Sequence, residues 1–239
     1  MHHEAAVLIP MHIGALDLSI TAQVFWTILS SVVVILFGFW ARRKMSPVPE
    51  RLSQHLFELT VNFIDTQVVE PNGLDTRRWT PLLLSLFLFI FLNNLSGVIP
   101  GATSGSSNIN NTMALAFVFF ILALALRFKH HGPFGFFKSL IPAGVNGPVV
   151  ALLFPIEFIS LLFQPISLAL RLFANLFGGH TLFVTIITFA ALASDFIVPI
   201  FAVGGGIIIL LFELFVSFIQ AYIFSFLSAL MIAEAIGEH

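Results

Sequence analysis

A single arginine lies in the middle of a long apolar segment of this sequence. Arg171 has about twenty mostly apolar residues on either side. An ionised arginine at the centre of a bilayer costs at least about 2.5–3.5 kcal/mol, so it is expected to face protein or water. Arginine also keeps its proton when desolvated, whereas lysine can lose it. We interpret Arg171 as a permanent functional cation; a side chain that reaches the interface, or simple structural pairing, is the alternative.

Polar side chains recur along the same segment at helical spacing. Glu157, Gln164 and Arg171 are seven residues apart, about two helical turns, and therefore share one face. Asn175 follows one turn later on that side. His180 is nine residues beyond Arg171, on the opposite face and about 13.5 Å further along the axis. The spacing predicts a helix with polar groups on two faces at different depths.

The last apolar segment carries a second polar stripe. Glu213, Ser217 and Gln220 fall at i, i+4 and i+7. Glu213 lies within the run IIILLFELFVSF, where an unpaired carboxylate is expected to be protonated or to have a partner. His180 on the facing helix is the candidate partner, and the two would suit a proton relay. A hydrogen-bonded structural histidine is the alternative.

Charged residues are rare in this sequence and hydrophobic residues are abundant. Of 239 residues only 9% are charged and 58% are hydrophobic, 29 of them Phe. Soluble domains average about 25% charged residues, and a globule of this size could not bury so much apolar surface. We predict an all-α integral membrane protein. A net charge of −2 argues against nucleic acid as a partner, and the absence of cysteine excludes disulfides and thiolate metal sites.

Five membrane-crossing helices are predicted from the apolar segments, since a crossing needs roughly 20 mostly apolar residues. They cover 18–40, 81–99, 111–126 and the two arms of a long tilted hairpin over 148–233. Thr80 is expected to cap the second span, with Pro81 at its first helical position. A basic, glycine-containing loop is expected after residue 126. The whole chain is treated as one membrane domain, 1–239.

The loops predict the orientation of the chain. Nine of the ten Lys and Arg residues fall on one side of the predicted spans, which favours an outer N-terminus and an inner C-terminus. Within the inner loop, residues 51–69 would place apolar side chains on one helical face and polar side chains on the opposite face. This is typical of an amphipathic surface helix; a plain connecting helix is the alternative. No internal repeat of the kind found in many transporters is present.

Three sequence runs resemble those of one family. Residues 165–180, PISLALRLFANLFGGH, resemble the signature of subunit a of F-type ATP synthases. Residues 213–224, ELFVSFIQAYIF, resemble the last helix of that family, and residues 94–100, NLSGVIP, resemble its NLxGLIP element. Chain length, five crossings, a surface helix and a long final hairpin also match.

The resemblance implies a role for each polar residue of the hairpin. Arg171 matches the stator arginine that faces the rotating c-ring, and Asn175 matches the asparagine one turn on. Gln220 matches the glutamine of the last helix that lies near this arginine, and Glu157 matches an acidic position of the inner half-channel.

The polar pair of the outer half-channel is matched with its two members exchanged. His180 and Glu213 occupy its positions, whereas many bacterial members have Glu first and His second. One acid and one base remain if the side chains meet. Gly97 stands where some bacterial members carry Asp, although Asn93, Asn94 and Ser96 are nearby.

The resemblance therefore implies an ion-conducting stator subunit. Two offset half-channels and the stator arginine would drive protonation and rotation of the c-ring, and so couple proton flow to ATP synthesis. The chain would have no catalytic site, metal or cofactor of its own. Its partners would be the c-ring, the b subunits, the rest of the F1FO complex and membrane lipid. We expect a bacterial plasma membrane, with the mitochondrial inner membrane as the alternative, and H+ rather than Na+ because His180 and Glu213 titrate readily.

Three other functions are compatible with parts of the pattern. A secondary transporter could hold its substrate at Arg171, Glu157 and Glu213, but repeats are missing. A membrane-embedded hydrolase or metal enzyme could use His180 and Glu213, but a zinc site needs three or more ligands and no HExxH or nucleophile motif occurs. A purely structural scaffold leaves Arg171 unexplained.

Overall fold

The chain folds as an all-α membrane protein, as predicted. The computed structural model describes residues 7–9, 12–13, 16–17, 19–44, 52–99, 104–141, 148–193 and 197–237. The α-helices are α1 (Ala22–Lys44), α2 (Leu52–Ile64), α3 (Thr76–Val98), α4 (Ile109–Ser139), α5 (Val149–Leu192) and α6 (Ile197–Ile236). Among the described residues five helices, all except α2, are long and apolar enough to cross a membrane.

Short elements complete the fold. A π-helical turn (Asp65–Val69) and a 3-10 turn (Glu70–Asn72) extend α2, and another 3-10 turn (Gly105–Ser107) precedes α4. Near the N-terminus β1 (Val7–Ile9) pairs antiparallel with β4 (Ile20–Thr21), and β2 (His12–Ile13) pairs with β3 (Leu16–Asp17). These four strands were not anticipated from the sequence.

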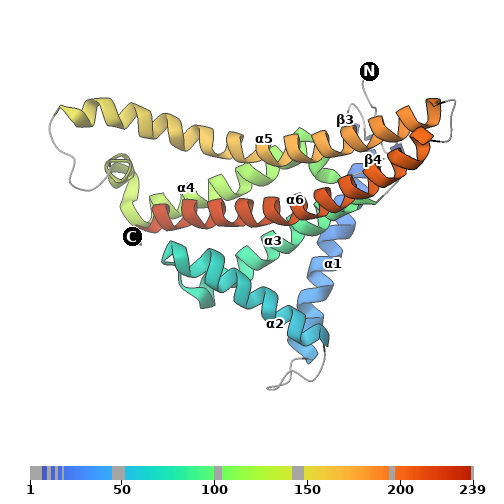
Figure 1. Cartoon of the computed structure of the whole chain (residues 1–239). Coiled ribbons are helices and arrows are strands. Elements are labelled where there is room, and N and C mark those ends of the chain that lie inside the picture. The colour runs from blue at the N-terminus through green and yellow to red at the C-terminus, as the bar shows by residue number, and fades with distance from the viewer. Residues whose placement is uncertain are drawn as a thin grey trace.

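Helices α5 and α6 form the long C-terminal hairpin that the sequence predicts. They run side by side across the molecule, whereas α1 stands steeply to them (Figure 1). Helix α5 is one continuous helix of 44 residues, although it contains Pro155 and Pro165. At 1.5 Å per residue it is about 66 Å long, more than twice the hydrocarbon thickness of a bilayer, so it must be inclined in the membrane.

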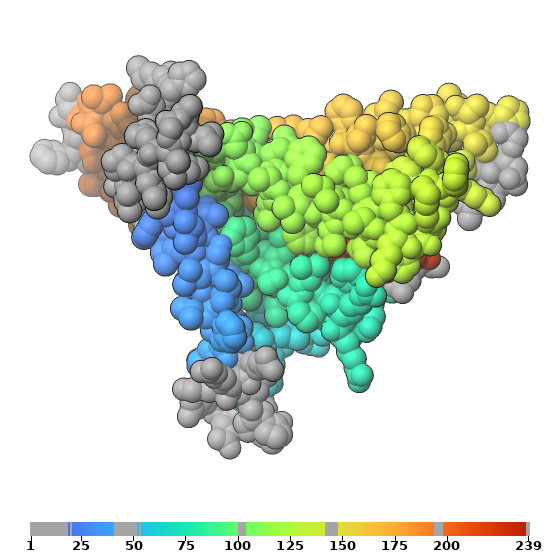
Figure 2. Space-filling model, turned by 180° about the vertical axis from the view of Figure 1, so that it is seen from behind, coloured from blue at the N-terminus to red at the C-terminus, as the bar shows by residue number. Residues whose placement is uncertain are grey.

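The core lies around the C-terminal half of α6. Phe224, Ile232 and Ala235 are fully or almost fully buried there, against α3, α4 and the π-helical turn. From behind, α4 covers most of this part of α6 (Figure 2). In contrast, α5 and the first half of α6 leave many large apolar side chains uncovered by this chain, including Phe201, Ile208 and Leu211. Those surfaces are available to lipid or to another subunit.

The surface helix α2 has the amphipathic character predicted for 51–69. Leu52, Leu56 and Leu59 are exposed on one side, whereas Gln54 is buried and bonds Glu58 at 2.8 Å. Phe63 packs its ring against Phe87, Phe218 and Tyr222. The exposed leucines suit the apolar side of a membrane interface.

The helix of the second predicted span begins five residues earlier than the predicted cap implies. Helix α3 begins at Thr76, where the Asp75 carboxylate accepts a hydrogen bond of 3.1 Å from the Arg77 N–H. Pro81 lies inside the helix, and Thr80 donates its hydroxyl to Asp65 instead of capping. The apolar run marks only the membrane-embedded part, whereas the aspartate satisfies the free N–H groups that define the helix end.

The loop expected after residue 126 is also helical. Helix α4 continues to Ser139 and breaks only at Gly132, where φ is 70° and ψ is 174°. The left-handed φ suits glycine, and Pro133 begins the next turn. This extension matters because it places Arg127 and His131 on a helix that packs against α6.

Candidate functional site

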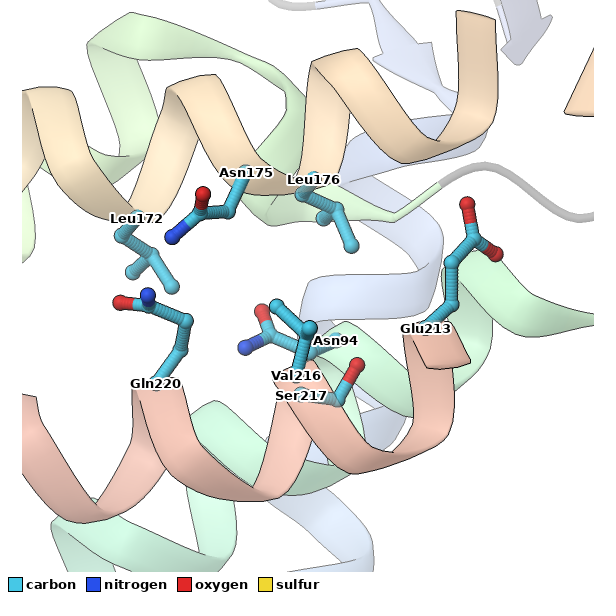
Figure 3. A pocket seen from close by; sticks show the side chains of 8 residues that line it. All are labelled: Asn94, Leu172, Asn175, Leu176, Glu213, Val216, Ser217 and Gln220. Carbon is cyan, nitrogen blue, oxygen red and sulfur yellow. The ribbon is translucent and has the colours of Figure 1, made fainter. Parts of the chain in front are cut away.

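The polar stripe of α6 faces a small cavity between α3, α5 and α6. The cavity has a volume of about 20 Å3. Its lining residues are Asn94, Leu172, Asn175, Leu176, Glu213, Val216, Ser217 and Gln220 (Figure 3). The prediction that Glu213, Ser217 and Gln220 share one face is confirmed. We call this space the hairpin cavity.

The side chains of the hairpin cavity come from opposite walls. Asn175 on α5 and Gln220 on α6 point toward one another, with Leu172 beside them (Figure 3). Asn94 is 1% exposed, and its Oδ1 and the Oε1 of Glu213 have no hydrogen-bond partner among the described residues. A cavity of this size has room for about one water molecule, which such buried acceptors favour. The hairpin cavity therefore gathers buried polar groups in an otherwise apolar region.

Helices α5 and α6 approach closely where Glu213 meets Gly179. A Cβ built at Gly179 would lie 3.1 Å from both Cγ and Cδ of Glu213, and it would also meet the carboxylate oxygen Oε1. The Glu213 side chain thus rests on the α5 backbone one residue before His180. No hydrogen bond between His180 and Glu213 is found in the described part of the chain, and His180 is exposed.

Gly179→Ala is expected to displace the Glu213 side chain or to separate the helices. Overpacking of this kind costs about 1–3 kcal/mol. We expect lower thermal stability of the solubilised subunit complex and slower proton transport. Gly178→Ala is the matched control because a Cβ at Gly178 meets nothing within 4 Å. Equal behaviour of the two variants would contradict the close approach.

A second, larger cavity lies nearer the open end of the hairpin, towards the start of α5 and the end of α6. Its volume is about 550 Å3. It is lined by residues of α4, α5, α6 and the segments that adjoin them: Arg127, His131, Ser139, Leu140, Ile141, Glu157, Ser160, Leu161, Gln164, Glu234 and Gly237. Glu157 and Gln164 therefore share one face, as their spacing predicts. We call this space the terminal cavity.

Arg171 lies between the two cavities along α5 and lines neither of them. The terminal cavity reaches Gln164 and the hairpin cavity begins at Leu172, eight residues or about 12 Å further along the helix. The Arg171 side chain is exposed, and no ion pair or hydrogen bond of it is found among the described residues. The expected shared face of Arg171 with Gln164 and Glu157 thus does not extend to a shared cavity.

Sequence reasoning missed two residues of the terminal cavity. Arg127 was counted with the basic loops, yet it is 6% exposed and lies 3.7 Å from Glu234 through its Nη2. The signal was present, since Arg127 follows the run LALAL with no turn residue between them. Across the described residues, no group of three or more His, Asp and Glu is placed to hold a metal ion.

These features define a class of protein before any comparison. The chain is a multi-pass helical membrane protein with two cavities, each lined in part by polar side chains, at different positions along one long hairpin. A family model described as the ATP synthase A chain matches residues 24–233. The chain belongs to this family, subunit a of the F-type ATP synthases. It is therefore a subunit of a membrane complex for ATP synthesis and ion transport.

Known relatives match nearly the whole chain. "ATP synthase subunit a" of Magnetococcus marinus is 36% identical, over 100% of this chain and 92% of the relative. The protein of the same name from Rhizobium rhizogenes is 35% identical, over 97% of this chain and 95% of the relative. That from Ehrlichia chaffeensis is 33% identical, over 95% and 92%. The resemblance inferred from three short runs therefore extends over the full length.

Proposed function

We propose that this chain is the ion-conducting stator subunit of its ATP synthase, with two offset half-channels separated by Arg171. The observation that carries the proposal is the pair of polar cavities at different positions along one hairpin, with a lone arginine between them. The terminal cavity would be the inner half-channel, with Glu157 on its wall. The hairpin cavity would belong to the outer half-channel, with Glu213, Asn175 and Gln220.

The chemistry follows from the cost of charge in lipid. A ring of c subunits would carry one carboxylate each at mid-membrane, and a carboxylate that faces lipid must be neutral. Opposite Arg171 the charged form is favoured instead, since an opposite charge lowers the pKa of an acid. Because Arg171 stays protonated, each ring carboxylate would lose its proton on one side of it and regain one on the other.

The direction of proton transfer would be set by the two paths. A proton that enters through one half-channel could leave only after the ring has carried it almost all the way round to the other. Arg171 would also block a direct leak, because a cation would have to pass it. His180 and Glu213 would relay protons on the outer side. This is consistent with H+ as the coupling ion.

The proposal extends to partners and orientation. Arg171, Asn175 and the uncovered apolar side chains of α5 and α6 would face the c-ring, and the b subunits would contact the chain elsewhere. The distribution of Lys and Arg supports an outer N-terminus and an inner C-terminus. The bacterial relatives support a bacterial plasma membrane.

Cysteine accessibility tests the two half-channels directly, since the chain contains no cysteine. Gln164→Cys and Ser217→Cys are introduced singly into the complete complex in sealed vesicles of both orientations. Ag+, a thiol-reactive ion close to water in size, is expected to modify Gln164→Cys only from the inner side and Ser217→Cys only from the outer side. Ile208→Cys, on an uncovered apolar surface of α6, is the control and should stay unreactive from either side. Modification of both test positions from the same side would overturn the proposal.

A further inference from the structure

The terminal cavity contains an ion pair with a buried arginine, which the proposed function does not use. Arg127 on α4 lies 3.7 Å from Glu234 on α6, and their side chains are 7% and 38% exposed. An arginine buried to this degree is strongly unfavourable unless a partner compensates its charge. The ion pair therefore holds two helices together at the cavity wall, far along the chain from Arg171.

One turn away, His131 on α4 and Gly237 just after α6 also line this cavity. His131 is four residues after Arg127 on α4, and Gly237 is three residues after Glu234 on α6. A Cβ built at Gly237 would lie 3.6 Å from Cε1 of His131. Gly237 has a φ of 74° and donates its N–H to the Ala233 carbonyl at 3.0 Å, which ends α6. Helix α4 and the end of α6 thus lie close together beside the ion pair.

The charges that line the cavity are unequal. Arg127 and His131 face it from α4, Glu157 from α5 and Glu234 from α6. Among the described lining residues, two carboxylates outnumber the one guanidinium. Arg127 also interacts electrostatically with Glu157, although Glu234 is its closer partner. The balance makes the cavity attractive to cations but less so than two free carboxylates would.

We propose that Arg127 is a positioning residue of the terminal cavity: it compensates Glu234, fixes the last turn of α6, and leaves one net negative charge, that of Glu157, on the wall. The inference rests on the proposed inner half-channel for its role in transport. In that half-channel, Arg127 would leave Glu157 as the single uncompensated carboxylate for proton exchange.

A charge-sensing cysteine tests this balance without measuring transport. Ser160 lines the cavity, and Ser160→Cys would be the only cysteine of this subunit. In the solubilised complex at low salt, Ser160→Cys is treated with a cationic or an anionic thiol reagent of similar size. Modification is followed by the mass of this subunit, and the ratio of the cationic to the anionic modification rate is measured. The parent is expected to favour the cationic reagent. Arg127→Gln should raise the ratio about threefold or more, and Glu157→Gln should lower it similarly.

Matched variants separate charge from shape. Arg127→Lys should leave the ratio near that of the parent, and the double variant Arg127→Gln/Glu234→Gln should restore it. If Arg127→Gln fails to assemble, Glu234→Gln alone gives the answer, because it should lower the ratio toward one. A cysteine at the exposed residue Asn110, at the other end of α4, is the control and should not respond.

Two results would overturn the inference. One is a ratio that none of the charge changes alters, and the other is an equal change in Arg127→Lys and Arg127→Gln, which would indicate shape alone. Failure of the proposed function is distinguishable, because it would show as side-independent cysteine accessibility at Gln164 and Ser217 while the charge ratio at Ser160 still followed these predictions.

Discussion

Arg171→Ala is expected to abolish ATP-driven proton pumping while the complex still assembles. The Arg171 side chain is exposed on α5, and it forms no hydrogen bond or ion pair found among the described residues. The fold is therefore not expected to depend on it. The proposed function depends on its charge, because no other cation of the hairpin would favour an ionised ring carboxylate. We expect a loss of about a hundredfold or more, the scale of removing a preorganised charge from a reacting group. Acidification of inverted vesicles on addition of ATP is the measurement.

Two further variants make this result specific. Arg77→Ala removes an exposed arginine from the first turn of α3 and should pump normally. Arg171→Lys keeps a cation that can lose its proton when desolvated, so it should retain little activity. Arg171→Ala membranes stripped of the soluble sector should also leak protons faster than the parent. Normal pumping by Arg171→Ala would rule out the proposed role.

Exchanging His180 and Glu213 should restore transport that either single replacement slows. Glu213 is buried with one carboxylate oxygen unpaired among the described residues, and it rests against the residue before His180. A positioned proton-transfer group contributes about 10²–10⁴-fold at most sites, and we expect His180→Ala and Glu213→Ala each to slow transport by at least about tenfold. The double exchange His180→Glu/Glu213→His keeps one acid and one base in place.

The control for these variants is a neighbouring residue whose replacement should not alter transport. Thr181 follows His180 and donates its hydroxyl to the Phe177 carbonyl of its own helix at 2.7 Å, so Thr181→Ala should transport normally. All variants are compared by the rate of ATP-driven proton uptake at matched amounts of assembled complex. An exchanged double variant no faster than the slower single variant would exclude a functional pair.

The sequence predicts features that depend on one helix at a time. The number of spans follows from apolar length, and the stripe of Glu213, Ser217 and Gln220 follows from the helical repeat. The shared face of Glu157 and Gln164 follows for the same reason. Each of these is a property of a single segment, and no knowledge of its neighbours is needed.

Features that depend on contacts between helices could not be predicted. The cavity around Asn94 requires the relative positions of α3, α5 and α6. Burial of Arg127 requires that α4 continue past its apolar run and meet Glu234, a residue more than a hundred positions away. The start of α3 was misplaced because Asp75, outside the apolar run, forms the cap. The apolar pattern alone assigned Arg127 to a loop, because it ends just before this residue.

The terminal cavity has an electrical consequence. A space of about 550 Å3 that admits water conducts far better than the hydrocarbon around it. If the cavity is the proposed inner half-channel, the membrane voltage would fall mainly across the insulating layer that remains, not across the full bilayer. One elementary charge would still gain about 2.3 kcal/mol per 100 mV, but over a shorter path. In the proposed function the electric field would therefore be strongest beyond the end of the cavity, in the stretch of α5 that carries Arg171.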